Sequence, residues 1–240
     1  MLPALTDPTL FRAPAATARP PDLIAEGLVC RRGERLVFAE LSFRLSAGGA
    51  LILTGANGSG KSSLLRLVSG LLAPAAGRLS WGTIPASADL AAHHAQLHYV
   101  GHLDALKPAM TPREMLVFWS ALRGQKLPRS ELAIDRALAA FALEAIADWP
   151  CRWLSAGQRR RVALARLLAV PAPLWLLDEP SSTLDNDSQD RLEAAIAGHR
   201  AKGGMVMLAT HTPIALDAAV SLALDAFTPQ PDDFDPDVAD

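Results

Sequence analysis

The chain has 240 residues, enough for one large α/β domain or for a core domain with a small subdomain. Half of the residues are hydrophobic and only 5% are aromatic, so Leu, Ala and Val must build most of the core. The formal net charge of −2 excludes a strongly basic surface for nucleic acid, and no apolar stretch is long enough to cross a bilayer.

The two ends of the chain differ in composition from the middle. Residues 1–22 contain five prolines and little periodicity, so we expect a disordered extension that resembles neither a signal peptide nor a transit segment. The tail 228–240 carries five aspartates and neither Lys nor Arg, and we expect it to be mobile. Residues 23–227 should therefore form the folded domain, and the expected compartment is the cytoplasm.

Within this domain, short β-type runs alternate with helical patterns. Ala50–Thr54, Leu174–Leu177 and Met205–Thr210 are nearly continuous apolar segments, typical of parallel strands that are covered on both faces. The earlier runs are more mixed and indicate an antiparallel portion. Between residues 112 and 149 the pattern is wholly helical. The sequence thus predicts an α/β fold with a mostly parallel sheet, an antiparallel β portion and a short helical subdomain over about residues 102–170. The expected strands are Leu23–Cys30, Leu41–Leu45, Ala50–Thr54, Leu79–Trp81, Leu97–Val100, Leu174–Asp178, Met205–Thr210 and Val220–Leu224.

Cysteine and histidine often bind metals in proteins, but here we expect neither group by itself to form a metal or haem site. Cys30 and Cys151 have no C-x-x-C spacing, and we expect both to be ordinary reduced thiols. His94, His98 and His102 are spaced by four, but residues 97–100 are expected to form a strand, which turns neighbouring side chains to opposite faces. We therefore expect no haem site at these histidines.

A phosphate-binding loop is indicated after the strand at residues 51–54. Residues 55–62 read G-x-x-x-x-G-K-S and lead into a helical pattern. Glycines turn successive N–H groups onto a phosphate, and the helix N-terminus adds the positive end of its dipole. Lys61 is expected to act on the β- and γ-phosphates of a nucleoside triphosphate, and Ser62 to ligate Mg²⁺. The expected nucleotide contacts are Gly55, Ala56, Asn57, Gly58, Ser59, Gly60, Lys61, Ser62 and Ser63.

Two acids end the apolar strand that begins at Leu174. A carboxylate at the C-terminal end of a buried parallel strand lies where ligands bind. We expect Asp178 to hold Mg²⁺ and Glu179 to polarise an attacking water as general base.

A second anion site is indicated by Leu154-Ser155-Ala156-Gly157-Gln158, directly before a helical pattern. A Ser followed by small residues at a helix N-terminus exposes N–H groups and a hydroxyl. This segment resembles the signature motif of ATP-binding cassette (ABC) proteins, and the resemblance spans about residues 23–227. It implies a P-loop NTPase of ABC type that uses ATP and Mg²⁺. It also implies a homodimer in which Ser155, Gly157 and Gln158 of one copy cover the γ-phosphate held by the loop of the other.

Further motifs match this family in order. Residues 181–185 resemble the D-loop that crosses the dimer interface, and His211 resembles the switch histidine that contacts the γ-phosphate. Two positions depart from the family. His102 stands where most ABC proteins have the glutamine that links Mg²⁺ to the membrane partner, and we assign it to the metal site. No aromatic residue occupies the usual adenine-stacking position, so Arg32 is expected to stack through its guanidinium plane, with Phe38 as the alternative.

Several segments resemble one subfamily, the ATP-binding subunits of haem exporters in cytochrome c biogenesis. They are residues 99–102, 159–167, 172–180 and 199–213, together with Ala156. The resemblance implies a peripheral ATPase at the cytoplasmic face of the bacterial inner membrane. Its integral-membrane partners would dock on the helical insert, and ATP hydrolysis would drive haem export or the release of a haem chaperone. Neither direct haem binding nor nucleic-acid binding is expected.

Three alternatives remain at the level of sequence. The chain could serve an exporter of a drug, lipid or peptide, or be a non-catalytic nucleotide sensor, against which the intact acids argue. A soluble ABC ATPase of DNA repair predicts a coiled-coil or zinc insert between Lys61 and Leu154, which are only 93 positions apart with neither feature between them. The run Arg159–Arg161 is expected to be a solvated helix face rather than a nucleic-acid site.

Overall fold

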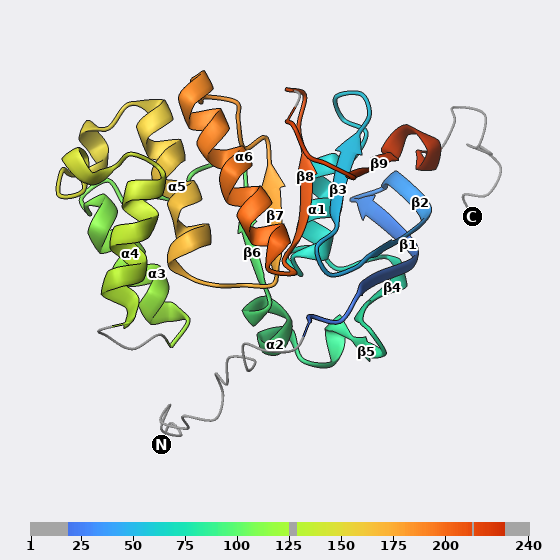
Figure 1. Ribbon diagram of the computed structural model, residues 1–240. Coiled ribbons are helices and arrows are strands. Elements are labelled where there is room, and N and C mark those ends of the chain that lie inside the picture. Colours follow the sequence, from blue (N-terminus) through green and yellow to red (C-terminus); the bar gives the residue numbers. More distant parts are fainter. Residues whose placement is uncertain (1–18, 125–128, 213, 229–240) are drawn as a thin grey trace, which may run out of the picture.

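The computed structural model describes residues 19–124, 129–212 and 214–228, so most of the two termini, for which disorder and mobility are predicted, lies outside the described residues. Two sheets lie side by side with helices between and around them (Figure 1). The antiparallel sheet has the order β2-β1-β4-β5 and the parallel sheet the order β6-β7-β8-β3-β9. The strands are β1 (Leu23–Arg32), β2 (Arg35–Leu45), β3 (Ala50–Thr54), β4 (Ala76–Trp81), β5 (Ile84–Pro85), β6 (Leu97–Val100), β7 (Leu174–Asp178), β8 (Met205–Ala209) and β9 (Val220–Ala223).

The predicted α/β architecture, with a parallel and an antiparallel sheet, is confirmed. Most predicted strands agree with the structure to within a few residues, but β2 begins at Arg35 rather than at Leu41. Val37 and Phe38 are both buried although they are neighbours, and Glu40 has a positive φ of 53°. Such an irregularity destroys the alternation by which a half-buried strand is recognised.

The parallel strands separate two hydrophobic cores because their side chains alternate between the faces of the sheet. In β7, Leu174 and Leu176 pack with α1 and the antiparallel sheet, whereas Trp175 and Leu177 pack with the helices of the other face. The strand is buried over its whole length for this reason. The helices are α1 (Lys61–Val68), α2 (Leu90–Ala95), α3 (Pro112–Leu122), α4 (Arg129–Ala140), α5 (Ala156–Ala169) and α6 (Asn186–Ala201).

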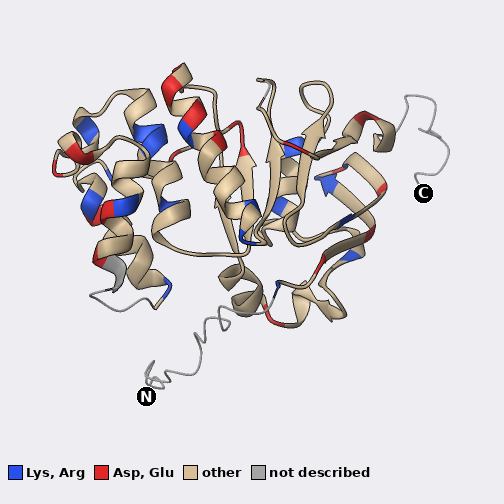
Figure 2. Ribbon diagram, viewed as in Figure 1, with Lys and Arg blue, Asp and Glu red and all other residues tan. Residues whose placement is uncertain are grey.

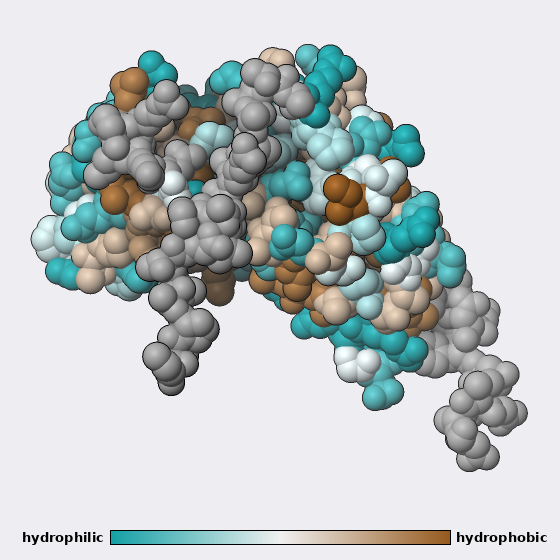
Figure 3. Space-filling model, turned by 90° about the horizontal axis from the view of Figure 1, so that it is seen from below, coloured by the Kyte–Doolittle hydropathy of each residue, from teal (hydrophilic) through white to brown (hydrophobic). Residues whose placement is uncertain are grey.

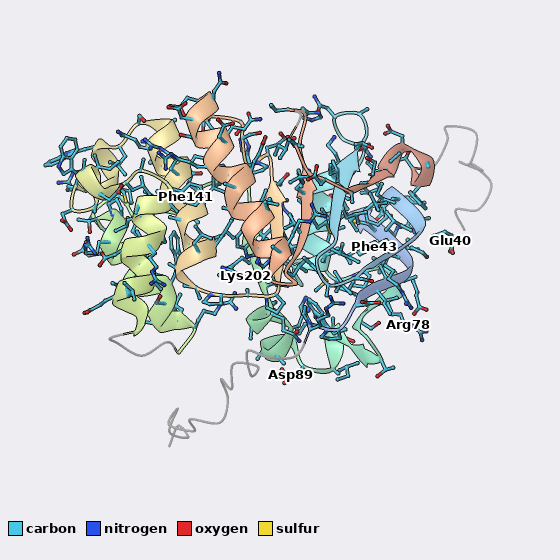
Figure 4. All side chains as sticks on the ribbon, viewed as in Figure 1. Glu40, Phe43, Arg78, Asp89, Phe141 and Lys202 are labelled. Carbon is cyan, nitrogen blue, oxygen red and sulfur yellow. The ribbon has the colours of Figure 1, made fainter. Side chains whose placement is uncertain are left out.

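The predicted helical insert consists of α3, α4 and the short 3-10 turns Glu144–Ile146 and Cys151–Trp153, and it packs on α5. Phe141 is fully buried in this part of the molecule (Figure 4). Leu122 and Leu132 lie within the predicted helical insert but are 59% and 56% exposed, so neither side chain belongs to its core. Charges of both signs are spread over the insert rather than gathered by sign (Figure 2).

Two expectations about individual residues can be checked against the fold. Cys30 and Cys151 are buried free thiols, as predicted, and burial raises the pKa of both. His98 and Tyr99 face opposite sides of β6: His98 is buried with its Nε2 2.6 Å from the Val170 carbonyl oxygen, whereas Tyr99 packs toward the other core. None of the described helices has the length and apolar content that a membrane span requires.

Candidate nucleotide-binding site

The phosphate-type loop connects the C-terminal end of β3 to the N-terminus of α1. Gly60 has a φ of 102°, which glycine adopts without strain. A Cβ at this position would lie 2.6 Å from Val37 Cγ1 and 3.1 Å from Phe38 Cδ1. The loop therefore rests directly on β2, and only glycine allows so close an approach.

The loop presents donors that suit a phosphate. The N-cap of α1 is Gly60, which provides no side-chain hydrogen bond, and the first turn of the helix carries no acid. Lys61 is only 8% exposed, and its Nζ donates to the carbonyl oxygens of Gly55 at 2.7 Å and Ala56 at 2.9 Å. Ser59 Oγ is buried without a hydrogen-bond partner in the described part of the chain. These donors and the glycine-lined loop fit a bound polyphosphate.

One contact to the loop was not foreseen from the sequence. The Ala56 N–H donates to the carboxylate of Asp225, at 3.3 Å from Oδ1 and 3.2 Å from Oδ2. Asp225 belongs to the 3-10 turn Leu224–Phe227 that follows β9. It lies 169 positions from its partner and is part of no recognisable motif, so only the fold reveals it.

A hydroxyl and a carboxylate lie in contact beside the loop. Ser62 Oγ donates to Asp178 Oδ1 at 2.9 Å, and the Tyr99 hydroxyl lies 3.5 Å from Asp178 Oδ2. Asp178 is 3% exposed, so its carboxylate is shielded from bulk water. A hydroxyl and a carboxylate next to a phosphate loop are the donor set that Mg²⁺ prefers. Burial raises the pKa of Tyr99, which keeps its hydroxyl protonated.

His102, which was assigned to the metal site, is exposed in the segment after β6. In the described part of the chain, no hydrogen bond joins its side chain to Ser62 or Asp178. The structure thus brings Ser62 and Asp178 together, but it does not join His102 to them.

The two proposed catalytic side chains are neighbours. The backbone N–H of His211 donates to Glu179 Oε2 at 3.3 Å, and the imidazole Nε2 lies 3.5 Å from Glu179 Oε1. Glu179 has a positive φ of 48°, and its N–H donates to the Ala209 carbonyl oxygen at 2.9 Å. The residue thus occupies a left-handed backbone conformation at the end of β7, which costs energy for a side chain other than glycine.

The signature-like segment begins α5 with a capping box. Ser155 Oγ accepts from the Gln158 N–H at 3.2 Å, and Gln158 Oε1 accepts from the Ser155 N–H at 2.8 Å. Gly157 is required because a Cβ would lie 2.8 Å from the Thr183 carbonyl oxygen. Over the described residues, no hydrogen bond or ion pair joins 155–158 to the loop 55–62, so the signature-like segment and the loop are not linked within one chain.

The two candidates for adenine stacking differ in accessibility. Arg32 is exposed at the end of the β1–β2 hairpin, where its backbone pairs with Arg35. Phe38 is fully buried beneath Gly60, so its ring cannot face a base. The alternative assignment to Phe38 is therefore wrong.

The expectation of a solvated arginine face is also wrong for one residue of the run. Arg160 is only 2% exposed, and its guanidinium donates to backbone carbonyls that come from two different segments of the chain. Arg159 and Arg161 are partly exposed and bond to carbonyls of their own helical region, Leu154 for the first and Phe141 and Ala142 for the second. Three consecutive arginines in a helix necessarily point in different directions, so one of them can face inward.

A parallel sheet with a glycine-rich phosphate loop, two acids at the end of a neighbouring strand and a separate capped signature helix define an ATP-binding cassette ATPase. The family model described as ABC transporter matches residues 38–182, more than half of the chain. The chain belongs to this family.

Relatives of high identity carry one common name. The chain is 59% identical over 206 residues to the cytochrome c biogenesis ATP-binding export protein CcmA of Rhodospirillum rubrum, covering 86% of this chain and 87% of the relative. It is 53% identical to the protein of the same name from Paramagnetospirillum magneticum, covering 85% and 94%.

Solved structures agree with the fold. The ATP-binding subunit of an ABC transporter superposes with a TM-score of 0.74 at 24% identity, covering 79% of each chain. An ATP-binding cassette of an ABC transporter in its ADP conformation gives 0.69 at 20% identity, covering 85% of this chain and 87% of the other.

Proposed function

We propose that the chain is the ATP-hydrolysing subunit of a bacterial ABC complex that exports haem, or releases a haem chaperone, during cytochrome c maturation. The relative from Rhodospirillum rubrum supports the biological role, because it is named for cytochrome c biogenesis and aligns with 86% of this chain. The pairing of Ser62 with Asp178 and of Glu179 with His211 supports the chemistry.

In this proposal each side chain has a separate task. Lys61 and the loop N–H groups hold the β- and γ-phosphates, and Ser62 and Asp178 hold Mg²⁺. When bound there, Mg²⁺ would supply positive charge that offsets the negative charge of the phosphates. Glu179 orients and deprotonates the attacking water, and His211, which contacts Glu179, is proposed to bind the γ-phosphate. In this proposal His102 joins the metal site when the exposed segment after β6 moves toward Ser62 and Asp178.

Two copies of the chain complete the sites. The signature segment has no bond to the loop of its own chain among the described residues, and the N-terminus of α5 presents backbone donors. We infer that Ser155, Gly157 and Gln158 of one protomer close over the nucleotide of its partner. A two-fold dimer of this kind contains two equivalent composite sites.

The membrane subunits would dock where the helical insert meets the α/β core. A pocket at this junction is lined by Tyr99 of β6, Trp119 and Leu122 of α3, and Arg123 and Arg166. Seen from below, hydrophobic residues reach the surface of both the core and the insert (Figure 3). Docking there would hold the subunit at the cytoplasmic face of the inner membrane.

Co-purification from membranes tests this assignment. The tagged chain should recover integral-membrane subunits that handle haem, and Leu122→Asp should reduce their recovery. Leu132→Asp is the matched control, because Leu132 is similarly exposed, at 56% against 59%, but lies on α4. Recovery of a different permease would remove the haem assignment and leave the ATPase intact.

A further inference from the structure

Arg160 is a buried cation whose five N–H donors all have acceptors. Nε donates to the Pro180 carbonyl oxygen at 3.1 Å, and Nη2 donates to those of Asp178 and Glu179, both at 2.8 Å. Nη1 donates to the Gly101 carbonyl oxygen at 2.8 Å and to Asp104 Oδ1 at 3.2 Å. A planar guanidinium has five N–H groups in a fixed fork, so this environment uses its full capacity.

The acceptors belong to two segments with different roles. Three of them are consecutive carbonyls that include Glu179, whose backbone lies in the left-handed region at a φ of 48°. The other two lie in the segment after β6, which carries His102 and borders the helical insert. Strained conformations persist where surrounding contacts hold them, and Arg160 supplies three such contacts to this turn.

We propose that Arg160 is a positioning residue that holds the strained Glu179 turn and ties it to residues 101–104. The proposal rests on the base role proposed for Glu179. Arg160 contacts only the backbone of Glu179 and leaves its carboxylate free for chemistry. A shift of residues 101–104, whatever causes it, would then change the position of the carboxylate through one side chain.

Lysine substitutions in the arginine run test the proposal in the full-length chain. Arg160→Lys keeps the positive charge but places its donors on one nitrogen, which cannot reach both segments. We expect kcat for ATP hydrolysis to fall at least about tenfold, whereas the Kd for ATP should change by less than about twofold. The matched control is Arg161→Lys, which affects only bonds to Phe141 and Ala142 in the helical part and should leave kcat within about twofold.

Amide hydrogen exchange supplies a readout that does not depend on catalysis. Residues 179–182 should exchange faster in Arg160→Lys than in the wild type, and at the wild-type rate in Arg161→Lys. Equal loss of kcat in both variants, a parallel loss of ATP affinity, or unchanged exchange at residues 179–182 would overturn the proposal. Glu179→Gln measures the base role on its own, so failure of that role remains distinguishable.

A second variant keeps the test open if Arg160→Lys does not fold. Asp104→Ala removes the charged partner of Arg160, and Asp104 is 24% exposed, so the substitution leaves no large cavity. It should lower kcat and speed exchange at residues 179–182 without changing ATP affinity. Asp135→Ala, which removes an ion pair to Arg113 inside the helical insert, should do neither. Wild-type behaviour of Asp104→Ala in both measurements would count against the proposal.

Discussion

The hydroxyl of Ser62 and the carboxylate of Asp178 lie 116 positions apart in the chain and 2.9 Å apart in the structure. Parallel neighbours β3 and β8, and then β8 and β7, bring the loop and the acid to the same edge of the sheet. This arrangement brings the phosphate-type loop and the carboxylate that we propose to hold Mg²⁺ together within one chain.

Ser62→Ala should specifically weaken the dependence on magnesium. Loss of the hydroxyl removes one oxygen ligand and the donor to Asp178, so the Mg²⁺ concentration for half-maximal ATPase activity should rise about tenfold or more. A magnesium titration at saturating ATP measures the effect. Ser69→Ala is the control, since Ser69 Oγ bonds Arg66 at the opposite end of α1. An unchanged titration for Ser62→Ala would contradict the assignment.

Glu179→Gln should separate binding from turnover. Glutamine keeps the shape of the side chain but cannot take a proton, so kcat should fall by about 10² to 10⁴ while ATP still binds. Equilibrium dialysis with ATP and a phosphate-release assay give the two quantities. Glu144→Gln, at an exposed acid of the 3-10 turn in the insert, should change neither. Substantial residual hydrolysis in Glu179→Gln would exclude this residue as the base.

Mixing two inactive variants tests the composite site. Lys61→Ala disables the loop, and Ala156→Asp places a negative charge at the exposed first turn of α5, where it favours the helix but repels phosphate. In a mixed dimer, one site carries both substitutions and the other carries none. An equal mixture should recover about a quarter of the wild-type rate if the sites of a two-fold dimer act independently. No recovery would argue for sites completed within one chain.

Acid should destabilise the protein through buried histidines. Burial lowers the pKa of His98 to about 3 and that of His199 to about 4, well below the value in the unfolded chain. Below about pH 6.5 the unfolded state therefore binds more protons, and stability falls as pH falls. For His98 the loss should approach about 1.4 kcal/mol per pH unit.

Urea unfolding between pH 7.5 and 5 measures this dependence. In His98→Gln the slope of the unfolding free energy against pH should decrease by about one bound proton. His94→Gln, at an exposed position in α2, serves as the control and should keep the wild-type slope. A wild-type slope in His98→Gln would show that another group controls the acid sensitivity.

The parts of the site that the sequence predicts are those encoded locally. The glycines of the loop and the acids after an apolar strand are recognisable because backbone geometry and strand ends impose those residue types at fixed spacing. The alternation of Leu174–Asp178 between two cores explains why an unbroken apolar run predicts a buried parallel strand.

The parts that the sequence does not predict depend on tertiary contacts. Arg160 and Asp225 act on carbonyls and N–H groups that are brought near by the fold, and a charged residue by itself predicts a solvated position. The burial of Phe38 depends on how closely Gly60 approaches β2, and no local sequence pattern indicates this approach.

The support of Gly60 by Phe38 also links ligand binding to the integrity of the whole molecule. The loop rests on the antiparallel sheet and is contacted at its start by Asp225 from near the end of the described chain. Because a nucleotide that binds only this assembled loop stabilises the native state by mass action, its concentration sets the resistance of the subunit to unfolding. Depletion of ATP would thus lower not only the work that the subunit performs but also its lifetime.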